Sequence, residues 1–137
     1  MIYLLDTSAY TGFKRNDTVI VSTLLAAERI FFSPIVMGEL VFGFRHGSRF
    51  RRNMEDLDLF LDEPVVELLP VGRTAADRYA RVAATLKAKG TPVPTNDIWI
   101  AAQTIASGAE LLTYDRRFEM IDGLILTLLR TAWQSDL

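Results

Sequence analysis

Four acidic residues are far apart in the sequence but occupy positions that a folded chain could bring together: Asp6, Glu39, Asp97 and Asp115. Asp6 and Asp115 each come just after a short apolar run that is typical of a buried strand. Glu39 lies inside an otherwise apolar segment, where an unpaired carboxylate would be costly. Asp97 falls in the first turn of a predicted helix. These positions predict one shared acidic pocket.

A pocket of four carboxylates indicates a bound cation. Clustered carboxylates repel one another, and without a cation some would bind protons through raised pKa values. The chain has no cysteine and only one histidine, His46, which excludes thiolate sites and histidine-rich sites. Oxygen ligands favour Mg²⁺ or Mn²⁺. In phosphodiester hydrolysis such ions activate the nucleophile and stabilise charge on the phosphate, so we expect a metal-dependent hydrolase.

Each acid also has a purely structural interpretation. Asp6 could cap the helix that follows it, and Asp97 could interact with the dipole of its own helix. Asp115 could be a surface turn residue paired with one of the two arginines that follow it. Glu39 is the hardest to explain in this way, because its neighbours are apolar. A structural role for all four is less expected than for any one.

Strands and helices that would position these acids alternate along the chain. The pattern predicts strands over 2–5, 29–32, 65–69, 110–113 and 124–128. It predicts a turn or helix opened by Thr7-Ser8, and helices over 18–28, 33–44, 48–61, 74–89 and 95–108. The expected caps are Ser33 with Pro34, Ser48, Thr74 in a capping box with Asp77, Gly90, and Thr95 or Asn96. This alternation predicts an α/β fold with a mostly parallel sheet, whose strands end at one shared edge.

The composition indicates one compact domain over residues 1–137, because half of the residues are hydrophobic. No apolar stretch reaches the roughly 20 residues that span a bilayer. The N-terminus shows no export signal, so we expect a cytoplasmic protein without a membrane anchor. A net charge of −2 argues against a protein that holds nucleic acid by electrostatics alone.

Four motifs in order along the chain resemble those of the PIN-domain ribonucleases, and specifically the VapC toxins of VapBC toxin–antitoxin modules. They are Tyr3 to Ser8, Glu39 in a helix entered through Ser33-Pro34, Asn96-Asp97 with Ile100-Ala101-Ala102, and Leu112 to Asp115 with Phe118. The resemblance covers essentially the whole chain. It departs at Arg117, where relatives often carry a polar or acidic residue, and at Leu128-Leu129-Arg130, which fits the family only loosely.

The resemblance implies a three-layer α/β/α sandwich with a central, mostly parallel sheet. It implies that Asp6, Glu39, Asp97 and Asp115 bind Mg²⁺ or Mn²⁺, with Thr113, Ser8 and Asn96 in support. The implied substrate is RNA, hydrolysed by a metal-activated water to leave a 3′-hydroxyl and a 5′-phosphate. It also implies a homodimer and a cognate antitoxin that covers the active-site groove.

Arginines form the densest positive patch of the chain, beside His46 and Phe50: Arg45, Arg49, Arg51 and Arg52. They could contact RNA phosphates, dock an antitoxin, or simply balance nearby acids on a solvated surface. Arg116 and Arg117 could hold RNA beside Asp115. The large apolar residues Met37, Phe42, Phe44 and Trp99 are expected in the core or a dimer contact, and Trp99 could alternatively stack a base.

Other functions stay open from the sequence. The same fold could serve an RNA-processing nuclease without an antitoxin, or a catalytically inactive module that binds RNA or protein. A receiver domain would need paired acids after the first strand and a lysine after the last, whereas the chain has a single Asp6 and no lysine after Asp115. A serine hydrolase would need a Gly-x-Ser-x-Gly elbow, which the sequence lacks.

Overall fold

Strands and helices alternate in the computed structural model, which describes residues 1–130; residues 131–137 of the expected domain lie outside the described residues. The strands are β1 (Ile2–Leu5), β2 (Arg29–Phe32), β3 (Val66–Leu68), β4 (Glu110–Thr113) and β5 (Leu126–Leu128). The helices are α1 (Thr7–Lys14), α2 (Thr18–Leu25), α3 (Pro34–Arg45), α4 (Phe50–Asp62), α5 (Arg73–Lys89), α6 (Thr95–Ser107) and the short 3₁₀ helix η1 (Arg116–Met120).

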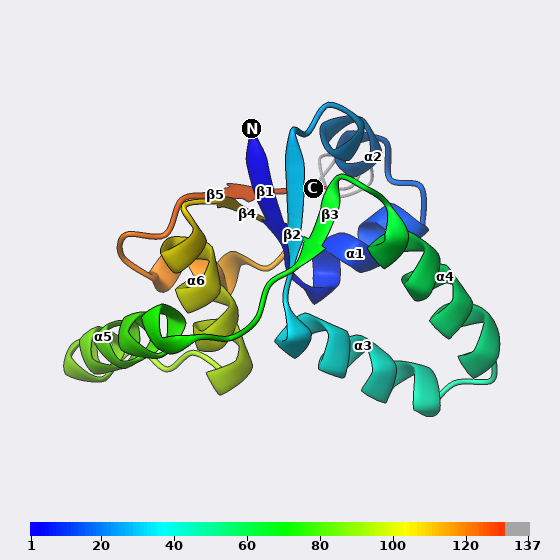
Figure 1. Ribbon diagram of the computed structural model, residues 1–137. Helices are drawn as coiled ribbons and strands as arrows, with labels where there is room; N and C mark the ends of the chain where they lie inside the picture. The colour runs from blue at the N-terminus through cyan, green and yellow to red at the C-terminus, as the bar shows by residue number, and fades with distance from the viewer. Residues whose placement is uncertain (131–137) are drawn as a thin grey trace.

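The five strands form one parallel sheet in the order β3-β2-β1-β4-β5. Parallel neighbours need crossover connections, and these carry helices over both faces of the sheet. Helices α1 to α4 lie on one side of the strands in Figure 1, and α5 and α6 lie on the other. The predicted three-layer α/β/α architecture with a parallel central sheet is therefore confirmed.

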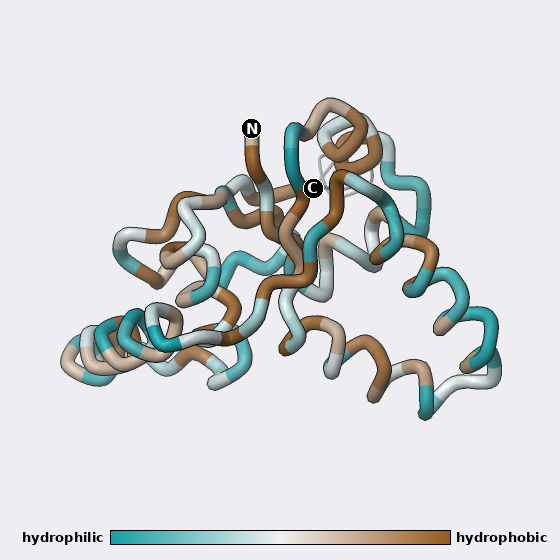
Figure 2. Tube along the Cα trace, viewed as in Figure 1, coloured by the Kyte–Doolittle hydropathy of each residue, from teal (hydrophilic) through white to brown (hydrophobic). Residues whose placement is uncertain are grey.

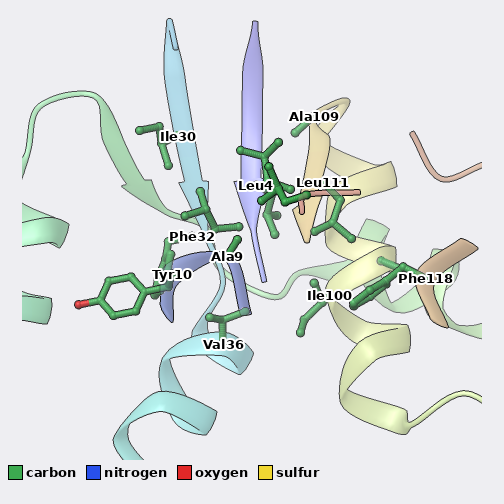
Figure 3. Close-up of a cluster of buried hydrophobic side chains, with 14 of the residues drawn as sticks. Leu4, Ala9, Tyr10, Ile30, Phe32, Val36, Ile100, Ala109, Leu111 and Phe118 are labelled. Carbon is green, nitrogen blue, oxygen red and sulfur yellow. The ribbon is translucent and has the colours of Figure 1, made fainter. Parts of the chain in front are cut away.

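Apolar side chains of the central strands form the core. Leu4, Leu5, Leu111 and Leu112 are fully buried, as expected for strands covered on both faces. Figure 3 shows aromatic and aliphatic side chains from the helices meeting these strands, and Phe32 contacts Tyr10 edge-on at 5.8 Å between ring centroids. The hydropathy tube in Figure 2 is mostly brown or tan along the strands, apart from teal at the start of β2 and within β3, and teal recurs along α4 and α5.

Helix α3 begins as the sequence predicts. Ser33 has an extended backbone, its Oγ accepts a hydrogen bond from the Ile35 N–H at 3.0 Å, and Pro34 follows as the first helical residue. Gly90 and Gly108 end α5 and α6 with positive φ angles of 69° and 74°, which favour glycine. These local signals were sufficient because they act within one helical turn.

Three other predicted caps are wrong. Helix α5 begins at Arg73 after Gly72, so Thr74 lies inside the first turn, and Asp77 pairs with Arg81 at 2.9 Å instead of closing a capping box. Helix α4 has Arg49 at its N-cap instead of Ser48, and α6 has Pro94 instead of Thr95 or Asn96. None of these three N-cap residues makes a side-chain capping hydrogen bond, so the backbone path of the preceding loop, and not the best capping side chain, sets the start of each helix.

Some boundaries also differ from the predictions. The predicted 18–28 helix ends at Leu25, the predicted 65–69 and 124–128 strands shorten to 66–68 and 126–128, and η1 was not predicted. Leu129 is nonetheless buried, so the tail that fits the family loosely still packs on the core. Within residues 1–130, no helix combines the length and the apolar character that a membrane crossing requires.

Candidate active site

The ends of β1 and β4 bring Asp6 and Thr113 together. These strands pair in parallel with Leu5 opposite Leu112, so the residues that follow them emerge side by side. The Thr113 hydroxyl donates a hydrogen bond to Asp6 Oδ2 at 2.6 Å. Both residues are buried, with Asp6 only 5% exposed. At the carboxyl ends of the central strands, the Asp6 carboxylate is therefore held in place by Thr113 of the neighbouring strand.

The second oxygen of Asp6 is also fully engaged. Asp6 Oδ1 accepts hydrogen bonds from the Ser8 hydroxyl at 2.7 Å and from the Ala9 N–H at 2.8 Å, which makes Asp6 the N-cap of α1. Burial raises the pKa of Asp6, and these hydrogen bonds oppose that rise by stabilising the carboxylate. The capping role and a place in the acidic pocket are thus compatible.

Glu39 connects three helices at the same edge. It lies in the second turn of α3, where Thr7 of α1 donates to its Oε1 at 2.6 Å. Asn96 of α6 donates to its Oε2 at 3.4 Å. Sequence reasoning missed the contact of Thr7, although its position directly after Asp6 was the available signal. Asn96, expected at a helix cap or in support of the site, contacts Glu39 instead of capping α6.

Asp97 has the most unusual environment of the four acids. Its side chain is 14% exposed, and within residues 1–130 its Oδ2 is buried with no hydrogen-bond partner. Burial raises the pKa of Asp97 to about 6; Arg117 opposes this rise, while the charges of Asp115, Glu39 and Asp6 add to it. Arg117 lies between Asp97 and Asp115, and Asn96, the neighbour of Asp97, contacts Glu39. Thr113 contacts both the Asp6 side chain and the backbone N–H of Asp115, so the four acids are linked through shared neighbours.

Asp115 is held by the residue that the sequence singled out as a departure. It caps η1 by accepting from the Arg117 N–H at 2.9 Å. The Arg117 guanidinium adds hydrogen bonds to both carboxylate oxygens, the shortest at 2.6 Å from Nη2 to Oδ2. The hydrogen bond from Arg117 holds the pKa of Asp115 below its ordinary value. The structural interpretation of Asp115, as a turn residue paired with one of the arginines that follow it, is therefore confirmed.

The oxygen atoms of the acidic pocket suit a hard divalent cation, although they are not arranged as a complete set of metal ligands. Carboxylate oxygens are the ligands that Mg²⁺ and Mn²⁺ prefer, and the buried Oδ2 of Asp97, which has no hydrogen-bond partner among residues 1–130, would suit such an ion. Among the described residues, no three acidic or histidine side chains already converge closely enough to enclose an ion. Asp115 is instead paired with the exposed guanidinium of Arg117 at 2.6 Å.

The predicted arginine patch surrounds the end of α3 and the start of α4, and its members are exposed: Arg45, Arg49, Arg51 and Arg52. The Arg45 guanidinium lies 4.7 Å from the centre of the Phe50 ring. Arg45 is six residues beyond Glu39, or about 9 Å along the helix axis, so the patch lies outside the pocket. Arg116 is also exposed and approaches Glu119 at 3.9 Å.

The aromatic residues divide between packing and exposure. Trp99 stacks on Tyr79 with ring centroids 4.1 Å apart, so its face packs α6 against α5 and the base-stacking interpretation gains no support. Met37 and Phe44 pack against the core as expected. Phe42 does not, because it is 67% exposed and lies 4.4 Å from the His46 ring.

A buried hydrogen-bond network that the sequence did not predict connects two of the helices that carry the acids. Gln103 is 3% exposed, accepts from the fully buried Ser33 hydroxyl, and donates to the carbonyls of Leu69 at 3.3 Å and Pro70 at 3.4 Å. It therefore links the start of α3 to α6 and to the loop after β3. Its signal was a glutamine on the otherwise apolar face of a predicted helix.

Comparison with known proteins identifies the family of this chain. The family model described as PIN domain matches residues 3–124. The chain belongs to the PIN domain family. This PIN-domain protein is 30% identical to Ribonuclease VapC1 of Haemophilus influenzae strain R2866 over 129 residues, which cover 90% of this chain and 95% of that one. It is 32% identical to Ribonuclease VapC2 of Rickettsia felis, over 92% of this chain and 96% of that one.

Solved structures agree with these relatives. The PIN-domain protein superposes with a TM-score of 0.84 on VapBC2 from Rickettsia felis bound to a DNA fragment from their promoter, at 28% identity and covering 93% of this chain and 98% of that one. VapBC-1 from nontypeable Haemophilus influenzae gives a TM-score of 0.82 at 26% identity, covering 93% and 97%. The resemblance to VapC ribonucleases found in the sequence motifs is therefore confirmed.

Proposed function

We propose that this PIN-domain protein is a Mg²⁺- or Mn²⁺-dependent endoribonuclease that acts as the toxin of a type II toxin–antitoxin system. The proposal is supported by four carboxylates from four separate segments that are linked through Thr113, Asn96 and Arg117 near the strand ends of a fold shared with proteins named ribonucleases. Ligands of open α/β sheets bind at that edge.

The four acids would hold the divalent ion: Asp6, Glu39, Asp97 and Asp115. Such an ion, when bound, supplies activation of the attacking water and stabilisation of charge on the phosphate. Thr113 and Ser8 orient Asp6 through their hydroxyl groups, and Thr7 and Asn96 orient Glu39. Asp97 brings an oxygen that has no competing hydrogen bond, so it is ready to ligate.

RNA as the substrate rests on the ribonuclease names of the relatives and on exposed positive charge near the pocket. The arginines between α3 and α4, together with Arg116, would contact the phosphates of a bound strand. Arg117 is less free to do so, because it is paired with Asp115. We expect removal of one patch arginine to weaken RNA binding without abolishing cleavage.

We infer a cognate antitoxin as partner from the structural relatives, which are the VapBC2 and VapBC-1 toxin–antitoxin structures. Exposed apolar side chains also support a protein contact, since Phe42 on α3 and Leu59 on α4 are each 67% exposed. The same arginine patch could pair with acidic residues of that partner. The homodimer, the cytoplasmic location and the single domain over residues 1–137 stay predictions.

Cleavage of a defined RNA by the purified chain, with Mg²⁺, Mn²⁺ or EDTA, tests this function. We expect turnover with either metal, none in EDTA, and a loss of at least about 100-fold in Asp97→Asn, because a metal ligand is removed. Asp58→Asn is the matched control, since this acid is exposed on α4. Cleavage by Asp97→Asn at the parental rate would rule out the mechanism.

Two alternatives predict different results. A catalytically inactive binding module would retain RNA without turnover in either metal. An RNA-processing nuclease without an antitoxin would cleave RNA but cause no growth arrest that a neighbouring small open reading frame relieves. Co-expression of that frame with the chain and with Asp97→Asn separates these cases from the toxin.

A further inference from the structure

Arg117 forms a bridge between two of the candidate metal ligands. Its Nη2 lies 2.6 Å from Asp115 Oδ2 and 3.7 Å from Asp97 Oδ2. Its Nε donates to both oxygens of Asp115, at 3.1 and 3.0 Å. One guanidinium therefore supplies the positive charge for the outer part of the acidic pocket.

The hydrogen bonds of Asp115 and Asp6 differ in a way that matters for a cation. Asp6 accepts from hydroxyl groups and a backbone N–H, which are neutral donors that can stay in place beside a metal ion. Asp115 accepts from a guanidinium, which is itself a cation and occupies lone pairs of both oxygens. A divalent ion that binds Asp115 would have to displace the guanidinium or lie beside it against like-charge repulsion.

Displacement of Arg117 is structurally simple. Its side chain is 60% exposed, so it can turn into solvent without unpacking the core. Exposed ion pairs contribute little to stability, and a divalent ion with several carboxylate ligands can outcompete one. Arg116, its neighbour, is 77% exposed and approaches Glu119 at 3.9 Å, with no contact to the four acids.

We propose that Arg117 is a built-in competitor of the divalent cation, which holds Asp115 until the ion displaces it and so weakens metal binding by the site. This inference rests on the proposed metal-dependent function and deepens it. Arg117 acts as a positioning residue, and the competition sets the concentration of Mg²⁺ or Mn²⁺ at which Asp115 joins the site.

Titration of the full chain with Mn²⁺, with free ion measured by electron paramagnetic resonance, tests the competition. We expect Arg117→Ala to bind Mn²⁺ about three- to fivefold more tightly than the parent, the upper part of the range that an exposed bidentate ion pair accounts for. Arg116→Ala removes the same formal charge one residue away, and its affinity should change less than about twofold. Equal affinities in the two variants would overturn the inference.

The arginine Nε–H signals in nuclear magnetic resonance give a second readout. The Arg117 Nε–H donates to Asp115 and should be protected from solvent exchange, and saturating Mg²⁺ should remove that protection. Persistence of the protected signal at saturating Mg²⁺ would overturn the competition. Parent and variants that bind Mn²⁺ equally would leave the nuclease proposal intact, whereas an absence of Mn²⁺ binding in every variant would overturn both proposals.

Discussion

Apart from Glu39, the acidic pocket consists of two halves that are built differently. The inner half consists of Asp6, Ser8 and Thr113, which are held at the ends of β1 and β4 by short hydrogen bonds between neutral donors and one carboxylate. The outer half consists of Asp97, Asp115 and Arg117. There one buried oxygen lacks a partner and one carboxylate is paired with a cation.

One half of the pocket is therefore rigid, and the side chains of the other half can exchange partners. The inner half gains its order from adjacent parallel strands, so its geometry cannot change without disturbing the sheet. The outer half depends on exposed or half-buried side chains that can exchange partners. We therefore expect changes in the inner half to reduce stability and activity together, and changes in the outer half to alter charge balance while the fold is preserved.

Thr113→Val should have the largest effect. It keeps the shape but removes the hydroxyl that donates to Asp6, leaving a buried charged oxygen with one partner fewer, and we expect a loss of about 3 kcal/mol in stability. Urea unfolding measures this. Thr127→Val is the control, because Thr127 makes a comparable bond to Glu110 at 2.8 Å on an exposed surface and should lose less than about 0.5 kcal/mol. Equal losses would mean that the inner half is not specially constrained.

Gly12→Ala should have the next largest effect, because it disturbs the segment that carries both Thr113 and Asp115. A Cβ at Gly12 would lie 2.6 Å from the Tyr114 ring, and the Tyr114 hydroxyl is anchored on Asp17. We expect a loss of about 2 kcal/mol from this overpacking. Thermal unfolding should show the opposite sign for Gly43→Ala, which has open space in α3 and gains helix propensity of about 1 kcal/mol.

Asp97→Asn should have the smallest effect on stability. It should stabilise the fold, by an amount that depends on pH. Because burial raises the pKa of Asp97 to about 6, the folded protein keeps a proton that the unfolded chain loses, and stability falls as pH rises from about 4 to about 6. Asparagine carries no such penalty. In EDTA at pH 7.5 the variant should be about 1 to 2 kcal/mol more stable than the parent, after allowance for solvent screening.

Urea unfolding of the parent and Asp97→Asn at pH 4 and pH 7.5 checks this prediction, with Asp58→Asn as an exposed control. The gain should be present at pH 7.5 and nearly absent at pH 4. A gain that is independent of pH would place its cause in packing instead of in the charge of Asp97. Saturating Mg²⁺ should reverse the order at pH 7.5, because the ion stabilises only the chain that retains the carboxylate.

Much of the fold could be predicted because its signals are local. The short runs that end at Leu5 and Thr113 predicted strands β1 and β4, and Ser33 with Pro34 predicted the start of α3. The wrong caps at Ser48 and Thr74 show the limit of this approach. A capping side chain competes with the backbone path that the preceding loop imposes, and that path depends on how the loop packs.

The residues that form hydrogen bonds around the site were harder to predict than the four acids. Thr7 and Gln103 are ordinary residues in sequence, and their roles arise only because α1, α3 and α6 meet at one edge. Phe42 was expected in the core or a dimer contact. It does not lie in the core, because helical periodicity does not show which face of α3 the neighbouring elements cover, and the dimer contact stays a prediction.

The sequence by itself determined which residues carry charge, where the strands end, and that any metal ligands must be oxygen atoms. Only the tertiary structure decided that Thr113 holds Asp6, that one Asp97 oxygen is left without a partner, and that Arg117 pairs with Asp115. The physical reason is range: strand and helix preferences act over a few residues, whereas burial and electrostatic interactions depend on segments about 100 residues apart meeting at one sheet edge.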